Sequence, residues 1–168
     1  MSRLVATFFG AGHLRPASGT WASAITVALA VAAYQAGLAL AVPVGFAVAT
    51  LAGFWAVPRY LAVTGGEDPS EVVIDEVAGQ LLALSFTVIP LWRHGVPDLL
   101  LGAWPGWVMP FLLFRLFDIW KPWLVGRTDR RGDAAGVMLD DLWAGLFAGI
   151  VSVVLAGLYH GVVQPWLG

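Results

Sequence analysis

Residues 21–57 read WASAITVALAVAAYQAGLALAVPVGFAVATLAGFWAV and contain no charged side chain. A membrane-spanning helix needs about 20 predominantly apolar residues, so this stretch is too long for one span and sufficient for two. Gly37 and Pro43 lie near its middle, where the chain must turn between two helices. The stretch therefore predicts a helical hairpin made of residues 21–40 and 42–57.

Three further apolar stretches follow, at residues 77–92, 99–117 and 142–163. The whole chain of 168 residues is 59% hydrophobic and only 12% charged, and its mean hydropathy is +0.80. A soluble domain carries about 25% charged residues, so this composition excludes a water-soluble globule. We expect an all-α, polytopic membrane protein with about five transmembrane helices, which form a single domain over residues 1–168.

Charge and cysteine content exclude several functions. The formal net charge of −2 does not provide the basic surface that binding to nucleic acid requires. The chain contains no cysteine, which excludes disulfides, thiolate nucleophiles and Cys-ligated zinc.

The charged residues are distributed unevenly between the two sides of the membrane. With five spans, every basic residue except Arg93 falls on the side of the N-terminus, and basic residues concentrate on the cytoplasmic side. The N-terminus is therefore expected in the cytoplasm. Every acidic residue except Asp98 falls on the same side, although acidic residues contribute little to orientation. Solvated loops account for Glu67, Asp68 and Asp133, but not for the acids that border the spans.

Five carboxylates border the predicted spans: Asp75 and Glu76 open the third, Asp118 closes the fourth, and Asp140 and Asp141 open the fifth. A charge at the edge of the bilayer is costly unless it is hydrated, paired or coordinated. The positive end of a helix dipole accounts for the four at helix starts, but not for Asp118 at a helix end. Carboxylates that converge without His or Cys favour a hard cation such as Mg²⁺. These five residues are the candidate metal ligands and catalytic groups.

Basic side chains accompany these acids. Arg115 lies three residues before Asp118 on the same helix face, and Lys121 and Arg127 follow it. Cations beside a carboxylate-bound metal suit a phosphate ester, because they neutralise the phosphoryl oxygens while a carboxylate activates water. Arg115, Lys121 and Arg127 are therefore candidate phosphate ligands, and Asp129 is a candidate further metal ligand.

A third element, Ser18-Gly19-Thr20, precedes the first span. Ser or Thr at this position can cap a helix, and spacing alone favours that interpretation. A helix N-terminus beside a glycine also binds anions, so Thr20 is a further candidate phosphate ligand.

Four blocks of residues follow one another over most of the chain: Gly19-Thr20, Asp68-Pro69-Ser70-x-x-Val73-x-Asp75-Glu76-x-x-Gly79-Gln80, Phe114-Arg115-x-Phe117-Asp118-Ile119-x-Lys121-Pro122-Trp123, and Gly136-Val137-Met138-Leu139-Asp140-Asp141-x-x-Ala144-Gly145. In this order they resemble the phosphatidylglycerophosphatase A family of bacterial membrane lipid phosphatases. The resemblance implies Mg²⁺-dependent hydrolysis of a phospholipid, phosphatidylglycerophosphate, to phosphatidylglycerol and inorganic phosphate. It also implies location in the bacterial cytoplasmic (inner) membrane. Two departures, Ala22 for a usual glycine and residues 131–135 for a Gly-rich stretch, affect the expected shape of the phosphate pocket.

The sequence lacks the residues that other classes of phosphatase use. The chain has no Asp-x-Asp pair, no cysteine, and not the histidines of the histidine lipid phosphatases. Attack by water and attack by an aspartate through a phospho-enzyme both remain open.

The alternative function is a cation or proton-coupled transporter, which would place acids near the span centres and on both sides. The Asp-Gly-x-x-Ala-Arg core of a CDP-alcohol phosphotransferase does not occur. The sequence sets neither the number of bound ions nor the oligomeric state.

Overall fold

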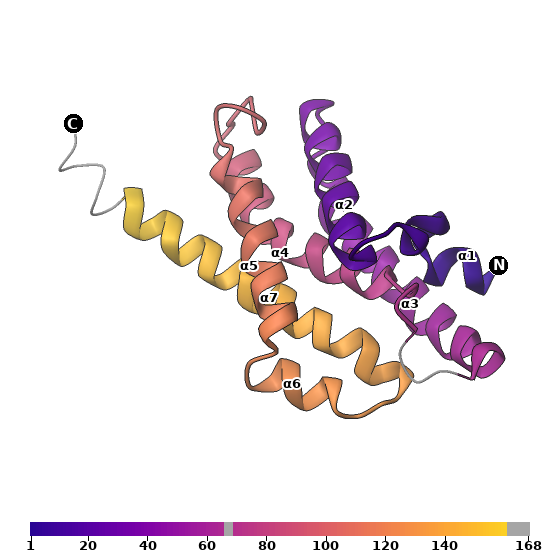
Figure 1. The fold of residues 1–168 in the computed structure, drawn as a ribbon. Coiled ribbons are helices and arrows are strands. Elements are labelled where there is room, and N and C mark those ends of the chain that lie inside the picture. The colour runs from indigo at the N-terminus through magenta and orange to yellow at the C-terminus, as the bar shows by residue number, and fades with distance from the viewer. Residues whose placement is uncertain (66–68, 161–168) are drawn as a thin grey trace.

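The computed structural model describes residues 1–65 and 69–160, and the regular elements in this part of the chain are all helices, as predicted (Figure 1). In chain order they are α1 (Ser2–Ala6), the 3-10 helix η1 (Phe8–His13), α2 (Ser18–Gln35), α3 (Ala41–Thr64), α4 (Ile74–Arg93), α5 (Pro105–Trp120), α6 (Leu124–Asp129) and α7 (Ala134–Leu158). The loop acids Glu67 and Asp68, and residues 161–163 of the predicted fifth span, lie outside the described residues.

Three of the described helices, α3, α4 and α7, are long and apolar enough to cross a membrane. α2 and α5 occupy two further predicted spans with 18 and 16 residues. The protein is thus an all-α membrane protein, and the count of five spans stays a prediction.

The helices α5 and α7 begin at other residues than the corresponding predicted spans, and a side-chain carboxylate explains each difference. Residues 99–104 form turns rather than the start of a span, because the Asp98 carboxylate accepts hydrogen bonds from the amides of the next residues, such as that of Leu100 at 2.9 Å. α7 begins eight residues before the predicted residue 142, because the Asp133 carboxylate accepts a hydrogen bond of 2.7 Å from the amide of Gly136. This N-cap satisfies a backbone donor that the helix leaves free.

α4 is the central helix of the fold. It packs against α7, α3, α5 and α2, and the side chains of Ala83 and Leu84 in its middle are fully buried. α7 crosses α5 obliquely, and α6 lies beside the start of α7 (Figure 1). The outer helices instead expose large apolar side chains, among them Leu51 on α3 and Leu112 on α5. Exposed apolar surface of this extent marks contact with a membrane.

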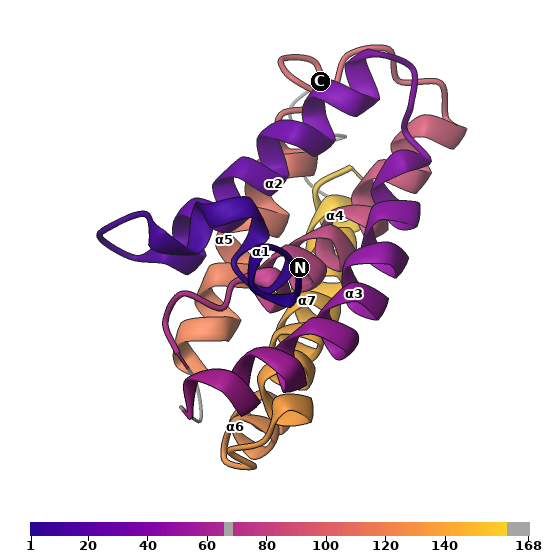
Figure 2. The ribbon, with the colours of Figure 1, turned by 90° about the vertical axis from the view of Figure 1, so that its right-hand side faces the viewer.

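The helices alternate in direction, so the ends that carry the predicted site come together. At this end the Ser18 hydroxyl, at the start of α2, donates a hydrogen bond of 2.5 Å to the carbonyl oxygen of Ser70, just before α4. At the opposite end, the Gln35 amide donates a hydrogen bond of 3.0 Å to Asp98. The turn of residues 99–104 and the end of α2 lie together at one extremity of the molecule in both views (Figures 1 and 2).

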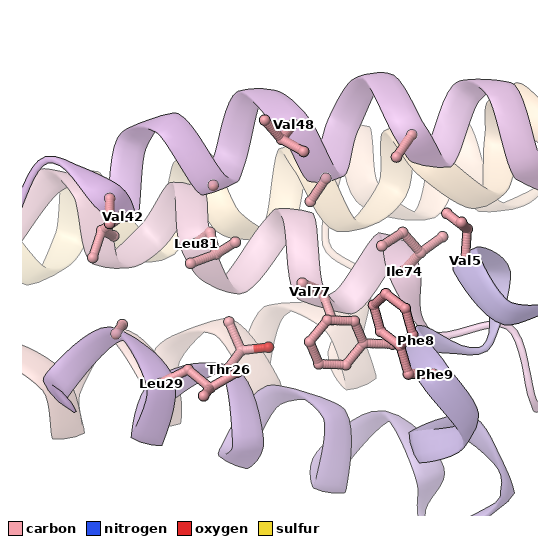
Figure 3. A pocket seen from close by; sticks show the side chains of 15 residues that line it. Val5, Phe8, Phe9, Thr26, Leu29, Val42, Val48, Ile74, Val77 and Leu81 are labelled. Carbon is pink, nitrogen blue, oxygen red and sulfur yellow. The ribbon is translucent and has the colours of Figure 1, made fainter. Parts of the chain in front are cut away.

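An apolar groove of about 480 Å³ runs between α2 and α3, with α4 as its floor. Val77 and Leu81 point into it from α4, and Phe8 and Phe9 lie at one end (Figure 3). Its lining contains no charged residue among those described. The acidic residues of the predicted site do not line this groove.

Candidate functional site

Two glycines set the approach of α4 and α7. A Cβ atom on Gly145 would overlap the carbonyl oxygen of Gly79, and a Cβ atom on Gly79 would lie 2.5 Å from the carbonyl oxygen of Asp141. The two backbones are therefore in direct contact. Asp75 lies one turn before Gly79, and Asp141 lies one turn before Gly145, so this contact brings the two acids together.

Three carboxylates form a compact group. Oxygen atoms of Asp75, Glu76 and Asp141 all lie within 4.8 Å of one another. Asp75 and Asp141 are buried, and Glu76 is half-buried. Glu76 Oε2 and Asp141 Oδ1 are buried without a hydrogen-bond partner among the described residues. Carboxylates at this separation repel one another strongly in a poorly solvated site, and all-oxygen donors are the ligands that Mg²⁺ prefers. These three residues therefore fit a divalent hard cation.

The two other predicted acids, Asp118 and Asp140, lie beside this group and are each paired with a cation. Arg115 Nη1 lies 2.8 Å from Asp118 Oδ2, within one helical turn of α5. Lys121 Nζ lies 3.2 Å from Asp140 Oδ2. The charge of Asp118 acts on both Glu76 and Asp141. All five predicted carboxylates are thus in one electrostatic cluster, three unpaired and two paired.

Lys121 is held by its backbone and by two acids. It ends α5 in the left-handed conformation with a φ of 52°, which costs a non-glycine residue of order 1–2 kcal/mol. Its Nζ donates to Asp129 as well as to Asp140. Burial favours a lower pKa for the ammonium, but the hydrogen bonds and charges of Asp129 and Asp140 outweigh this effect and raise the pKa of Lys121. Lys121 is therefore a fixed cation, and Asp129 is its partner.

The two remaining predicted phosphate ligands are at least partly exposed. Arg127 is exposed in the last turn of α6, and Thr20 is half-buried in the first turn of α2. The predicted helix cap is wrong: the N-cap residue of α2 is Ala17, without a side-chain cap, and Ser18 bonds to the carbonyl of Ser70 instead. Ser18 and Thr20 are themselves residues of the helix rather than its N-cap.

The start of α2 lies directly against the acidic cluster. A Cβ atom on Gly19 would overlap Oε1 of Glu76, so the helix backbone and this carboxylate are in contact. The positive end of the helix dipole stabilises negative charge at this position, whether on a carboxylate or on a bound anion.

If the protein has the phosphatase activity that its sequence predicts, we expect Gly19→Ala to lower phosphate release at least about tenfold, because the added methyl group displaces the Glu76 carboxylate and misplaced groups lose rate steeply. The matched control is Gly45→Ala on α3, whose Cβ atom would meet Leu81 at an ordinary 3.5 Å. Steady-state assays of phosphate release by both purified variants check this prediction. Equal activity of the two variants would contradict the contact between Gly19 and Glu76.

Sequence reasoning missed two residues of this region, Ser23 and Gln80. Both side chains are fully buried, and Ser23 Oγ and both amide atoms of Gln80 lack a hydrogen-bond partner among the described residues. The sequence did carry a signal for both residues, a hydroxyl and an amide inside otherwise apolar spans. Burying such polar groups in a membrane costs free energy, so their presence indicates a functional role.

The cluster has an excess of negative charge. Among the described residues, the ion pairs of its five carboxylates are those of Asp118 with Arg115 and of Asp140 with Lys121. A phosphate group is repelled from such a site unless further positive charge is present. A bound divalent cation satisfies both the unpaired carboxylates and an incoming phosphate.

Comparison with known proteins identifies the family. Residues 4–156 match the family Phosphatidylglycerophosphatase A. A putative phosphatidylinositol-3-phosphatase of Bacteroides thetaiotaomicron is 36% identical over 156 residues, which are 90% of this chain and 91% of the relative. Phosphatidylglycerophosphatase A of Haemophilus influenzae is 30% identical over 149 residues, 88% of this chain and 84% of the relative.

A third relative, phosphatidylglycerophosphatase A of Escherichia coli, is 29% identical over 104 residues, which are 61% of this chain and 49% of the relative. No solved structure matches the chain. The match of nearly the whole sequence, together with a cluster of carboxylates and cations at one end of a membrane-embedded helical bundle, shows that the chain belongs to the phosphatidylglycerophosphatase A family of enzymes.

Proposed function

We propose that this protein hydrolyses phosphatidylglycerophosphate to phosphatidylglycerol and inorganic phosphate, in a Mg²⁺-dependent reaction at the cytoplasmic face of the bacterial inner membrane. The observation that carries the proposal is the group of Asp75, Glu76 and Asp141 at the crossing of α4 and α7, in a chain of this family. A relative named for phosphatidylinositol-3-phosphate shares the chemistry, because both lipids carry a phosphomonoester on a hydroxylated head group.

Asp75, Glu76 and Asp141 would hold the cation, as their converging oxygens suggest. When bound, Mg²⁺ supplies positive charge that stabilises the phosphoryl oxygens in the transition state. Arg115 and Lys121, each already beside an acid of the cluster, would balance the remaining phosphate charge. Arg127 and Thr20 are further candidate phosphate ligands.

The chemistry requires one bond to form and one to break. The oxygen of a water molecule bonds to phosphorus while the bond from phosphorus to the glycerol oxygen breaks. A carboxylate of the cluster accepts a proton from the attacking water, and the leaving glycerol oxygen takes a proton from solvent water to become a hydroxyl. The carboxylate then returns its proton to solvent, so that one water is consumed for each phosphate released. The carboxylates, which greatly outnumber the local cations, serve as the general base.

The membrane setting supports a lipid substrate. The cluster lies near the starts of α4 and α7, both of which are long and apolar enough to span the bilayer. A phosphate at this level is reached by a lipid whose acyl chains remain in the bilayer. The excess of basic residues on this side supports a cytoplasmic site.

The same arrangement disfavours the transporter. Within residues 1–65 and 69–160, the buried acidic side chains are Asp75, Asp140 and Asp141, and all lie at one end of the bundle. An ion path needs polar groups across the bilayer. Buried acids at one end alone are what an interfacial enzyme requires.

Phosphate release by the purified protein in detergent tests the proposal. With phosphatidylglycerophosphate we expect release in Mg²⁺ and loss of release in EDTA, restored by added Mg²⁺. Inside-out membrane vesicles should hydrolyse added substrate without detergent, whereas sealed right-side-out vesicles should not. A folded sample that releases no phosphate with either treatment, but conducts cations in liposomes, would replace the phosphatase with the transporter.

A further inference from the structure

The buried polar atoms that lack partners are concentrated on one side of α4. Among the described residues, atoms without a hydrogen bond belong to Ser23, Glu76, Gln80, Arg115 and Asp141, with Thr50 on α3 as the one exception. Arg115 nevertheless has an ion-pair partner in Asp118. An unpaired buried polar group costs about 1–3 kcal/mol, so such a concentration indicates a place for a ligand. The carboxylates and Arg115 belong to the proposed metal and phosphate site, which leaves Ser23 and Gln80 unexplained.

Helix register places Ser23 and Gln80 at one level, one turn beyond the contact of Gly19 with Glu76. Gln80 follows Glu76 by four residues on α4, so both side chains share a face. Ser23 follows Gly19 by four residues on α2, and Gly19 is in contact with Glu76. Both helices begin at the same end of the molecule, so one turn further along each brings Ser23 to the level of Gln80. This level lies about 5.4 Å deeper in the bundle than the carboxylates.

The chemistry of the two side chains defines their ligand. An amide and a hydroxyl each donate and accept hydrogen bonds, and neither carries a charge. They match a neutral hydroxyl group better than a cation, which the carboxylates attract, or an anion, which Arg115 and Lys121 attract. Both residues are fully buried, so a hydroxyl bound there is shielded from bulk water.

We propose that Ser23 and Gln80 form a subsite for the hydroxyl group that neighbours the phosphate ester on the head group of the lipid substrate. This inference rests on the proposed lipid phosphatase activity. With the phosphate at the carboxylates and the acyl chains in the bilayer, the glycerol lies on the deeper side of the phosphate. Its free hydroxyl is on the carbon next to the ester, at the level of Gln80 and Ser23. The subsite makes the enzyme selective for hydroxylated head groups.

Two substrates test this subsite: phosphatidylglycerophosphate and its analogue with a 1,3-propanediol head group, which lacks only that hydroxyl. A site built to bond a hydroxyl discriminates strongly against an analogue without it, because its own polar groups are then left unpaired. We expect kcat/KM of the wild type to favour the natural lipid at least about tenfold. In Gln80→Met the ratio of kcat/KM for the natural lipid to kcat/KM for the analogue should fall close to 1. The fall should come from lower activity on the natural lipid, with activity on the analogue unchanged.

Ser23→Ala provides a smaller change on the other helix and should lower the ratio in the same direction. Thr50→Val is the matched control, because Thr50 Oγ1 is also buried without a partner but lies on α3, outside this region. It should leave the ratio at the wild-type value.

The possible failures are distinguishable. Equal loss of activity on both lipids in Gln80→Met and Ser23→Ala, or a wild-type ratio near 1, would overturn the subsite and leave the phosphatase in place. Failure of the wild type to hydrolyse either lipid would overturn the proposed function, and the subsite with it.

Discussion

Asp141→Asn is expected to lower phosphate release at least about 100-fold, while the protein still folds. Asp141 contributes one of the three converging carboxylates, and its Oδ1 is buried without a partner among the described residues. The amide keeps the size of the side chain but removes a negative charge and a strong oxygen donor, so affinity for the cation falls. Loss of a single stabilising group from a preorganised site costs about 10²–10³-fold in rate.

The matched control for this variant is Asp98→Asn at the opposite end of the bundle. Asp98 also accepts backbone hydrogen bonds, and an asparagine oxygen can accept them in its place. We expect wild-type turnover for this control in the same detergent assay. Activity of Asp141→Asn within a few fold of the control would remove Asp141 from the site.

Gly145→Ala is expected to have an effect of similar size, although it changes no polar group. The added methyl group would overlap the carbonyl oxygen of Gly79, so α4 and α7 must separate. Overpacking of this kind costs about 1–3 kcal/mol. A shift of about 1 Å in catalytic groups costs on the order of 100-fold in rate. Both the melting temperature and the turnover should therefore fall.

Gly157→Ala on the same helix is the control for this prediction. A Cβ atom at Gly157 meets nothing within 4 Å among the described residues, and alanine is the better helix former by about 1 kcal/mol. This variant should keep wild-type turnover and an equal or higher melting temperature. If Gly145→Ala behaved in the same way, the close approach of α4 and α7 would not be what positions Asp75 and Asp141.

Much of the fold was accessible from the sequence because the bilayer restricts the choice of structure. Apolar length predicted the helices: α4 lies within three residues of its predicted range at either end, whereas α3 begins one residue before its predicted range and extends seven residues beyond it. Hydropathy could not predict the starts of α5 and α7, because these depend on the Asp98 turn and the Asp133 cap. Single side-chain hydrogen bonds decide such boundaries, and apolar length carries no information about them.

The candidate site was predicted as a set of residue types at one face of the membrane. Their position at the edges of apolar spans pointed to Asp75 and Asp141. The convergence of these two carboxylates depends on the backbone contact of Gly79 with Gly145. One sequence contains no distances, so it could not separate the three unpaired carboxylates from the two paired with Arg115 and Lys121. Ser23 was missed because a lone serine in an apolar helix usually bonds to its own backbone.

Binding of Mn²⁺, followed by its electron paramagnetic resonance spectrum in the purified, detergent-solubilised protein, tests the proposed metal site most directly. Mn²⁺ prefers the same oxygen ligands as Mg²⁺ and reports binding without turnover. We predict saturable binding to the wild type and to Asp98→Asn, competed by Mg²⁺, and binding weakened at least about tenfold in Asp141→Asn. Equal binding to Asp141→Asn and wild type, or a folded wild type that binds no Mn²⁺ with phosphate present, would contradict a metal site formed by Asp75, Glu76 and Asp141.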